Sequence, residues 1–413
     1  YKLLGLTDPF EPQAFPVRLW DVFGQAGHPV RATVEGMGSL LLSRLLDLNE
    51  TQSGILAIVF KVAQEKDWPL IDLKDLQSLL KEVYEHSSDY SAQYGNITKQ
   101  SVGAIQRSLL VLEEEGADQF FGEPALDLND FMQLDASGRG YINILSATKL
   151  FHSPKLYSTF LIWMLSRLFE TLPEVGDPEK PKLVFFFDEA HLLFKDASKL
   201  FLEKVEQVVR LIRSKGVGIY FITQNPQDLP ESVLAQLGNR VQHALRAYTP
   251  KEMKAIKVAA QSFRPNPDFD TETVITELGT GEALVSFLNE KGQPSVVERA
   301  YILSPQSSFD LLNESEQLAL ITTSPFHQKY ATTIDRESAY EKLAAKASKE
   351  AQEEEKKEAE KERAATEKAE QKRSPGRPRK SSLEKAKDSF LSSLFRTIAR
   401  EIAKLIMGSF KRK

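Results

Sequence analysis

The sequence predicts an α/β fold, in which a largely parallel, doubly wound sheet is joined to a helical subdomain and a charged C-terminal tail. The first observation is the apolar run Val184–Phe187, which is typical of a strand buried on both faces. The second is a further apolar run, Ile219–Thr223, which follows a helical pattern and a glycine turn at 216–218. The third is a long region of helical periodicity nearer the N-terminus.

Shifts in composition divide the chain into five parts. We predict a connecting region with a sheet-edge strand at 1–36, a helical subdomain at 37–135, the α/β core at 136–310, a charged low-complexity linker at 311–382 and a basic amphipathic helix at 383–413.

The first two parts are recognised by their spacing. Residues 1–36 are rich in Pro and Gly and contain one strand-like run at 15–21. From about residue 37 to 115, apolar residues recur every three or four positions, as in the set Leu76, Leu79, Leu80 and Val83. This periodicity predicts four or more amphipathic helices.

The core begins with a turn at 135–140 that leads into a strand at 141–145. This turn faintly resembles the start of a calcium loop, but Ser146 stands where the loop needs a bidentate acid, so a plain turn is favoured. The order that follows is a helix at about 154–172, the strand ending at Phe187, a helix at about 198–214, the second strand, and further strands at 241–246, 282–287 and 296–300.

Composition excludes several kinds of site. The 413 residues include no cysteine, and the six histidines lack zinc-type spacing, so magnesium is the only metal we expect. There is no run of eighteen apolar residues and no signal-peptide pattern, and we expect a cytoplasmic protein. Because the chain opens on Tyr1 rather than Met, we also expect an upstream segment.

Charge is unevenly distributed. The formal net charge is −5, yet the segment from Lys372 onward has thirteen basic and three acidic residues, which gives +10 there and leaves −15 for the rest. Within this basic module, the segment 374–380 contains a Gly-Arg-Pro core typical of minor-groove contacts, although short basic linkers are common. The apolar stripe of the last helix could lie on an acidic membrane surface or dock on a partner helix, and partner docking or self-association is slightly favoured.

Two carboxylates, Asp188 and Glu189, directly follow the first core strand. The carboxyl ends of parallel strands are where such sheets present chemistry, and an acidic pair there has the layout of a Walker B element. Asp188 would then order the water shell of Mg²⁺, and Glu189 would be the general base. The alternative is an acidic helix start, which the helix dipole stabilises by about 0.3–1 kcal/mol. We expect His191, which continues the D-E-A-[HR] pattern of motor ATPases, to be a helix-face contact rather than a catalyst.

Gln224 follows the second core strand, so its side chain should enter the same crevice, where it could sense a terminal phosphate or position water. The alternative is a turn-forming Gln-Asn-Pro segment. We expect a basic series around the same sheet end, made of Arg210, Arg213, Lys215, Arg240 and Arg246. Arg213 is the first choice for a cation donated to a neighbouring subunit's nucleotide, worth about 10³–10⁵ in rate. Arg240 is a further candidate nucleotide contact, and surface salt bridges are the competing explanation.

A Walker B element normally works with a phosphate-binding loop, G-x-x-x-x-G-K-[ST], whose amides and lysine hold the phosphates. In this sequence no glycine is followed by Lys and then Ser or Thr. The carboxylates are therefore present without the loop that usually accompanies them.

Four segments carry a resemblance to a known family. Residues 185–194, 210–218, 223–226 and 237–240 resemble the HerA/FtsK superfamily of ring-forming ATPases, and most of all its YjgR-type, HerA-like proteins. The similarity extends from about residue 15 to 306. It implies a RecA-like P-loop core, ATP and Mg²⁺ as cofactors, a homo-oligomer that is expected to be a hexamer, and translocation on or unwinding of double-stranded DNA.

Proteins of this kind carry the phosphate loop upstream of the region that matches Trp20 and Asp21 here. The resemblance therefore implies that the chain is the C-terminal part of such an ATPase and is inactive on its own. The alternative is a non-hydrolysing scaffold or a membrane-associated adaptor on the same fold.

Overall fold

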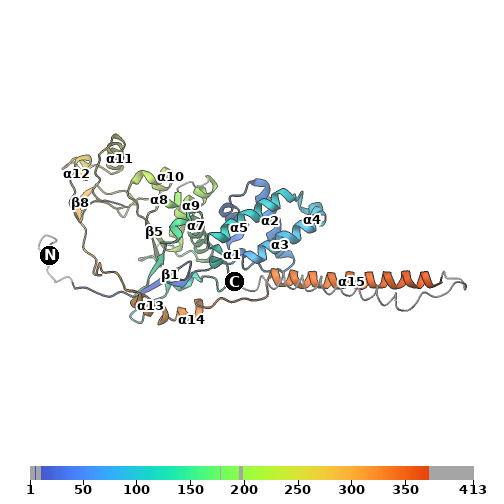
Figure 1. Cartoon of the computed structure of the whole chain (residues 1–413). Coiled ribbons are helices and arrows are strands. Elements are labelled where there is room, and N and C mark those ends of the chain that lie inside the picture. Colours follow the sequence, from blue (N-terminus) through green and yellow to red (C-terminus); the bar gives the residue numbers. More distant parts are fainter. Residues whose placement is uncertain (1–4, 6–10, 177, 195–198, 372–413) are drawn as a thin grey trace. The chain divides into compact units, whose positions relative to one another are not determined.

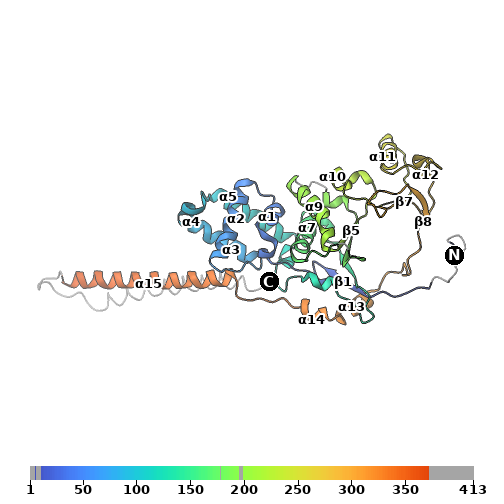
Figure 2. The same cartoon turned by 180° about the vertical axis from the view of Figure 1, so that it is seen from behind.

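The structure is a computed structural model that describes residues 5, 11–176, 178–194 and 199–371. The chain divides into two compact units, Tyr1–Ala345 and Lys346–Lys413. Figure 1 and Figure 2 show the chain from opposite sides. Our predictions for the Gly-Arg-Pro segment and the final helix concern residues that lie outside the described ones.

Six helices form the region that the periodicity predicted. They are α1 (Val34–Leu45), α2 (Glu50–Glu65), α3 (Leu73–Glu85), α4 (Ser87–Tyr94), α5 (Lys99–Glu114) and α6 (Ala117–Phe120). Asn49 and Asp72 begin α2 and α3 with capping boxes, which satisfy backbone N–H groups that the helices cannot. The leucines and valine singled out on α3 are fully buried. Figure 1 shows α2, α3 and α5 packed side by side.

The first sheet is parallel and has three strands in the order β2 (His28–Pro29), β1 (Val17–Asp21) and β3 (Ile142–Ser146). We predicted a sheet-edge strand near β1, and that prediction is wrong because β1 is the central strand. Its second neighbour, β2, has only two residues and is too short to show a strand pattern in the sequence. The Asp21 carboxylate stabilises the loop between β1 and β2 by accepting hydrogen bonds from the backbone N–H groups of Phe23, Gln25 and Ala26 at 2.8–3.0 Å.

A second parallel pair lies in the core. It joins β4 (Leu183–Phe187) to β5 (Val217–Phe221), with Phe187 opposite Phe221. Helix α7 (Pro154–Thr171) precedes β4, and α8 (His191–Phe194) and α9 (Lys199–Leu211) lie between β4 and β5 in the sequence.

The two faces of β4 and β5 differ. Phe187 is buried and stacks on Phe221, whereas Phe186 is 64% exposed and stacks on the half-exposed Tyr220 with ring centroids 4.6 Å apart. The prediction that this strand is buried on both faces is therefore wrong, since within the described residues nothing covers the side that carries Phe186. Four apolar residues in a row do not reveal by themselves which face has a partner.

A separate antiparallel sheet follows, in the order β6 (Arg240–Gln242), β7 (Glu282–Ser286) and β8 (Glu298–Tyr301). Two helices, α11 (Pro250–Gln261) and α12 (Thr271–Glu277), pack with it around a core that includes Ile256, Phe263 and Leu284. Figure 2 shows this group together. The predicted strand at 241–246 is thus shorter and does not extend the parallel sheet.

The region after β8 contains α13 (Glu314–Thr322), α14 (Phe326–Tyr330) and α15 (Ala339–Gln371). We predicted a low-complexity linker from residue 311, but α13 lies against β1 and α14 lies against β2. The reason is that Phe326 and Tyr330 are buried aromatic anchors in an otherwise polar segment. Residues 347–365 of α15 are exposed, as expected for a solvated helix.

A buried polar network holds α14 in place. The carboxylate of Asp130 accepts hydrogen bonds from the Tyr330 hydroxyl at 2.5 Å and from the Lys329 ammonium at 2.8 Å. The Arg18 guanidinium donates to the Asp130 backbone oxygen at 3.0 Å and lies 4.2 Å from the ring centroid of Phe326. Charged groups that are desolvated in this way remain stable only when they are paired.

His28 gives the protein a specific sensitivity to acid. Burial, together with the nearby His327 and Arg18, lowers the pKa of His28 from its ordinary value of 6.5 to about 4. Both ring nitrogens are buried without a partner among the described residues. As the pH falls, His28 is therefore protonated near pH 6.5 in the unfolded chain but only near pH 4 in the folded protein.

We expect the stability due to His28 to be complete above pH 6.5 and to be lost as the pH falls towards 4, by about 3 kcal/mol in all. Urea unfolding of the His28→Phe variant should show a shallower loss of stability across this range than the unmodified protein. The exposed His152, changed to Phe, is the matched control. Equal slopes for His28→Phe and the unmodified protein would contradict the prediction.

Candidate functional site

The predicted carboxylates lie at the carboxyl edge of the β4–β5 pair. Phe187 and Phe221 end the two strands opposite each other, and Ile222 continues the ladder by donating its N–H to the Phe187 oxygen at 2.9 Å. The chain then turns, and the Ala190 N–H donates to the Ile222 oxygen at 2.9 Å. Asp188 and Glu189 therefore occupy a turn that is tied to the end of the neighbouring strand.

Glu189 has an unusual backbone. Its φ is +48°, in the left-handed region that non-glycine residues rarely adopt. Such conformations cost on the order of 1–3 kcal/mol and persist where the surrounding structure enforces them. Here the enforcement comes from the Ala190 bond to Ile222 and from the Leu192 N–H, which donates to the Glu189 oxygen at 2.9 Å.

The Glu189 side chain contacts two polar neighbours. The Gln224 amide donates through Nε2 to Glu189 Oε1 at 3.0 Å, and His191 Nδ1 lies 3.2 Å from Glu189 Oε2. The structure thus brings together the predicted general base and the predicted phosphate sensor. The turn itself is made by Asn225, whose side chain accepts the Gln227 N–H at 3.0 Å, which leaves the Gln224 amide for Glu189.

Asp188 is exposed beside this pair, and its Oδ1 accepts the Glu189 N–H at 3.0 Å. Burial, together with the negative charge of Asp188, raises the pKa of Tyr157 on α7 to about 12, so this phenol stays protonated. The described part of the chain has no cluster of three or more His, Asp and Glu side chains suited to a metal ion. A single exposed carboxylate nevertheless fits Mg²⁺, which commonly takes one or two carboxylates together with water and substrate phosphates.

The predicted basic series does not gather at this edge. Arg213 lies in a 3₁₀ turn, Ile212–Lys215, at the amino end of β5. At about 3.3 Å per residue, the five residues of β5 place Arg213 roughly 13 Å or more from the carboxylate edge. Lys215 forms an ion pair with Glu174 at 3.0 Å. Arg213 therefore lies at the opposite edge of the sheet from Glu189.

Arg240 and Arg246 contact the backbone in the antiparallel region. Arg240 donates to the Ser262 oxygen at 2.7 Å, and burial lowers its pKa. Arg246 donates to the oxygens of Thr276 and Leu278. Both guanidiniums thus satisfy carbonyls at the ends of α11 and α12, where a positive charge is favourable.

His191 is the residue whose contact the sequence did not predict. We expected it on a helix face, but it begins α8 and faces the Glu189 carboxylate. The sequence did contain one indication of this contact, because His191 lies only two residues after Glu189, at the first position of the helix that follows the turn.

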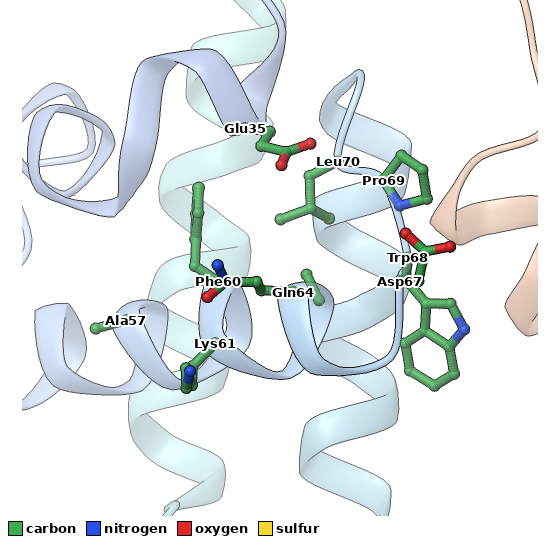
Figure 3. Close-up of a pocket in the computed structure, with 10 residues that line it drawn as sticks. Glu35, Ala57, Phe60, Lys61, Gln64, Asp67, Trp68, Pro69 and Leu70 are labelled. Atoms are coloured by element: carbon green, nitrogen blue, oxygen red, sulfur yellow. The ribbon is translucent and has the colours of Figure 1, made fainter.

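One pocket lies elsewhere, in the helical region, and has a volume of about 450 Å³. Figure 3 shows Phe60 on α2, Trp68, Pro69 and Leu70 in the segment that follows it, and Glu35 of α1 next to Leu70. It contains none of the predicted site residues. The carboxylate edge of β4 and β5 is therefore the candidate functional site.

Comparison with known proteins agrees with the resemblance. The family model described as "Helicase HerA-like C-terminal" matches residues 2–413. The chain belongs to this family. The predicted membership of the HerA/FtsK superfamily is thereby confirmed, and the parallel pairs β1–β3 and β4–β5 confirm the α/β class.

Individual HerA relatives match parts of the chain. The DNA double-strand break repair helicase HerA of Saccharolobus solfataricus is 25% identical over 211 residues, which is 50% of this chain and 40% of that protein. HerA of Sulfolobus acidocaldarius is 30% identical over 99 residues, 24% of this chain and 19% of that protein. This HerA-family chain thus spans less than half the length of the curated relatives it matches.

A solved structure is also similar in its chain trace. The plasmid coupling protein TrwB in complex with ADP and Mg²⁺ has a TM-score of 0.46 and 13% identity, over 73% of this chain and 74% of that chain. Among the helices that the structure describes, none has the length and apolar character needed to cross a membrane.

Proposed function

We propose that this chain is the C-terminal part of a ring-forming, cytoplasmic ATPase that translocates on or unwinds double-stranded DNA with ATP and Mg²⁺. The observation that carries the proposal is the contact of Glu189 with Gln224 at the carboxyl edge of β4 and β5, beside the exposed Asp188. Membership of the HerA-like helicase family supports it, as does the name of the HerA relatives as DNA repair helicases.

In this mechanism the three residues have distinct tasks. Asp188 offers an exposed carboxylate to the water shell of Mg²⁺, and the bound ion supplies positive charge against the phosphates. Glu189 accepts a proton from the attacking water. Gln224 orients the Glu189 carboxylate through Oε1 and lies where it could sense a terminal phosphate.

The place of Arg213 favours assembly into a ring. At the opposite edge of the sheet from Glu189, its guanidinium is poorly placed to serve a nucleotide held by its own carboxylates. A site shared between subunits needs a cation from the neighbour, and Arg213 would supply it within a homo-oligomer, expected to be a hexamer. Arg240 is a further candidate nucleotide contact, and in the structure its guanidinium donates to the Ser262 oxygen.

A second candidate is a non-hydrolysing scaffold or membrane-associated adaptor that uses residues 383–413 for a membrane surface or a partner helix. The observation behind it is that residues 1–413 contain no G-x-x-x-x-G-K-[ST] segment.

Hydrolysis by the full-length natural protein separates the two candidates. We expect Mg²⁺-dependent ATP turnover that duplex DNA stimulates and that EDTA abolishes. The stimulation should weaken steeply with salt, because phosphate contacts release counterions. If neither nucleotide binding nor hydrolysis can be detected in the presence of duplex DNA, the result would contradict the proposed ATPase function and favour the adaptor.

A further inference from the structure

Two buried polar atoms of the candidate site lie close together, and both lack a hydrogen-bond partner among the described residues. Glu189 Oε2 and His191 Nδ1 are both buried, and neither makes a hydrogen bond within the described part of the chain. They are 3.2 Å apart. The second carboxylate oxygen, Oε1, already accepts from Gln224.

A proton on Nδ1 would satisfy both atoms at once. A neutral imidazole carries its proton on one of two nitrogens, and only the Nδ1–H form gives this contact a donor. With the proton on Nε2, two acceptors would face each other in a buried site, which is unfavourable because neither could be satisfied. The contact therefore selects the form with a proton on Nδ1.

We propose that His191 is a positioning residue, which holds the Glu189 carboxylate through an Nδ1–H···Oε2 hydrogen bond. One donor on each oxygen, from Gln224 and from His191, fixes the plane of the carboxylate and stops it rotating. Each oxygen keeps a further lone pair for the proton of the attacking water. The left-handed turn at Glu189 and the start of α8 at His191 bring the two side chains together.

The hydrogen bond can be tested without measuring activity. In the full-length protein labelled with ¹⁵N-histidine, the His191 signals are assigned as those lost in His191→Asn. We expect Nδ1 to carry a proton at pH 8, and its shift to change in Glu189→Gln. A His191 ring with an unprotonated Nδ1 at that pH would overturn the proposal.

The consequence for turnover rests on the proposed ATPase function. His191→Leu should lower kcat by roughly tenfold to a hundredfold, as losses of orienting partners do elsewhere, with KM for ATP unchanged. His191→Asn, whose Nδ2 can replace the Nδ1 donor, should keep most of the turnover. The exposed His152→Leu is the control.

The outcomes separate the two claims. If His191→Leu turns over like the unmodified protein, or if His191→Asn is as impaired as His191→Leu while both are folded, positioning by His191 is wrong. If the unmodified protein itself fails to hydrolyse ATP, the proposed function is wrong, and the ¹⁵N experiment decides the hydrogen bond independently.

Discussion

Replacing Glu189 with Gln in the full-length protein should lower ATP turnover by roughly 10²–10⁴-fold, the usual contribution of a general base, and leave nucleotide binding intact. The amide has no basic oxygen for the proton of the attacking water. It can still accept from Gln224 and donate to His191, provided that the imidazole moves its proton to Nε2. The local packing should therefore survive while the chemistry stops.

The measurement is single-turnover hydrolysis beside equilibrium binding of ATP. Glu170→Gln is the matched control, because Glu170 is exposed on α7 and its ion pair with Arg167 is a surface pair of little energetic weight. Turnover by Glu189→Gln within a few-fold of the control would remove Glu189 from the role of base. Loss of binding together with turnover would instead assign the residue to the nucleotide pocket.

The largest effect on stability is expected from Tyr330→Ala, at about 3–5 kcal/mol, the range for large aromatic side chains removed from a core. Tyr330 is fully buried beside Trp20, with ring centroids 5.4 Å apart. Its hydroxyl donates to Asp130 and accepts the Asp127 N–H at 3.1 Å. Burial and the bond to Asp130 raise the pKa of Tyr330 to about 12, so it remains a donor at neutral pH.

Urea unfolding followed by circular dichroism measures this effect. Tyr330→Phe keeps the ring and loses the hydroxyl, so we expect an intermediate loss of about 1–3 kcal/mol from the partners left unsatisfied. Tyr248→Ala is the control, because that side chain is 88% exposed. A Tyr330→Ala variant as stable as the control would mean that α14 does not dock as described.

Much of the local structure follows from the sequence because the determinants are local. The spacing of Leu76, Leu79 and Leu80 predicted a buried helix face, and Asp72 begins that helix with its own side chain. The meeting of Glu189 and Gln224 was also predictable, since parallel strands bring their carboxyl ends to one edge.

The features that could not be predicted from the sequence depend on strand pairing and on backbone torsion angles. Nothing near Phe186 tells which strand face finds a partner, and β2 is too short to have a pattern. The place of Arg213, by contrast, was predictable: it precedes the second core strand in the sequence and therefore lies at the strand's amino end, away from the carboxylates. The contact of His191 required a left-handed residue at Glu189, which no propensity predicts.

The left-handed backbone at Glu189 also limits how substitutions there can be interpreted. Side chains branched at Cβ, such as Val, Ile and Thr, are strongly disfavoured at positive φ, whereas Asn, Asp and Gly tolerate it. If a variant with a branched side chain at this position loses turnover, the loss would combine distortion of the turn with removal of the general base. In a saturation library at this codon, only the unbranched members separate proton transfer from conformation, and glycine removes the torsional strain and the carboxylate together.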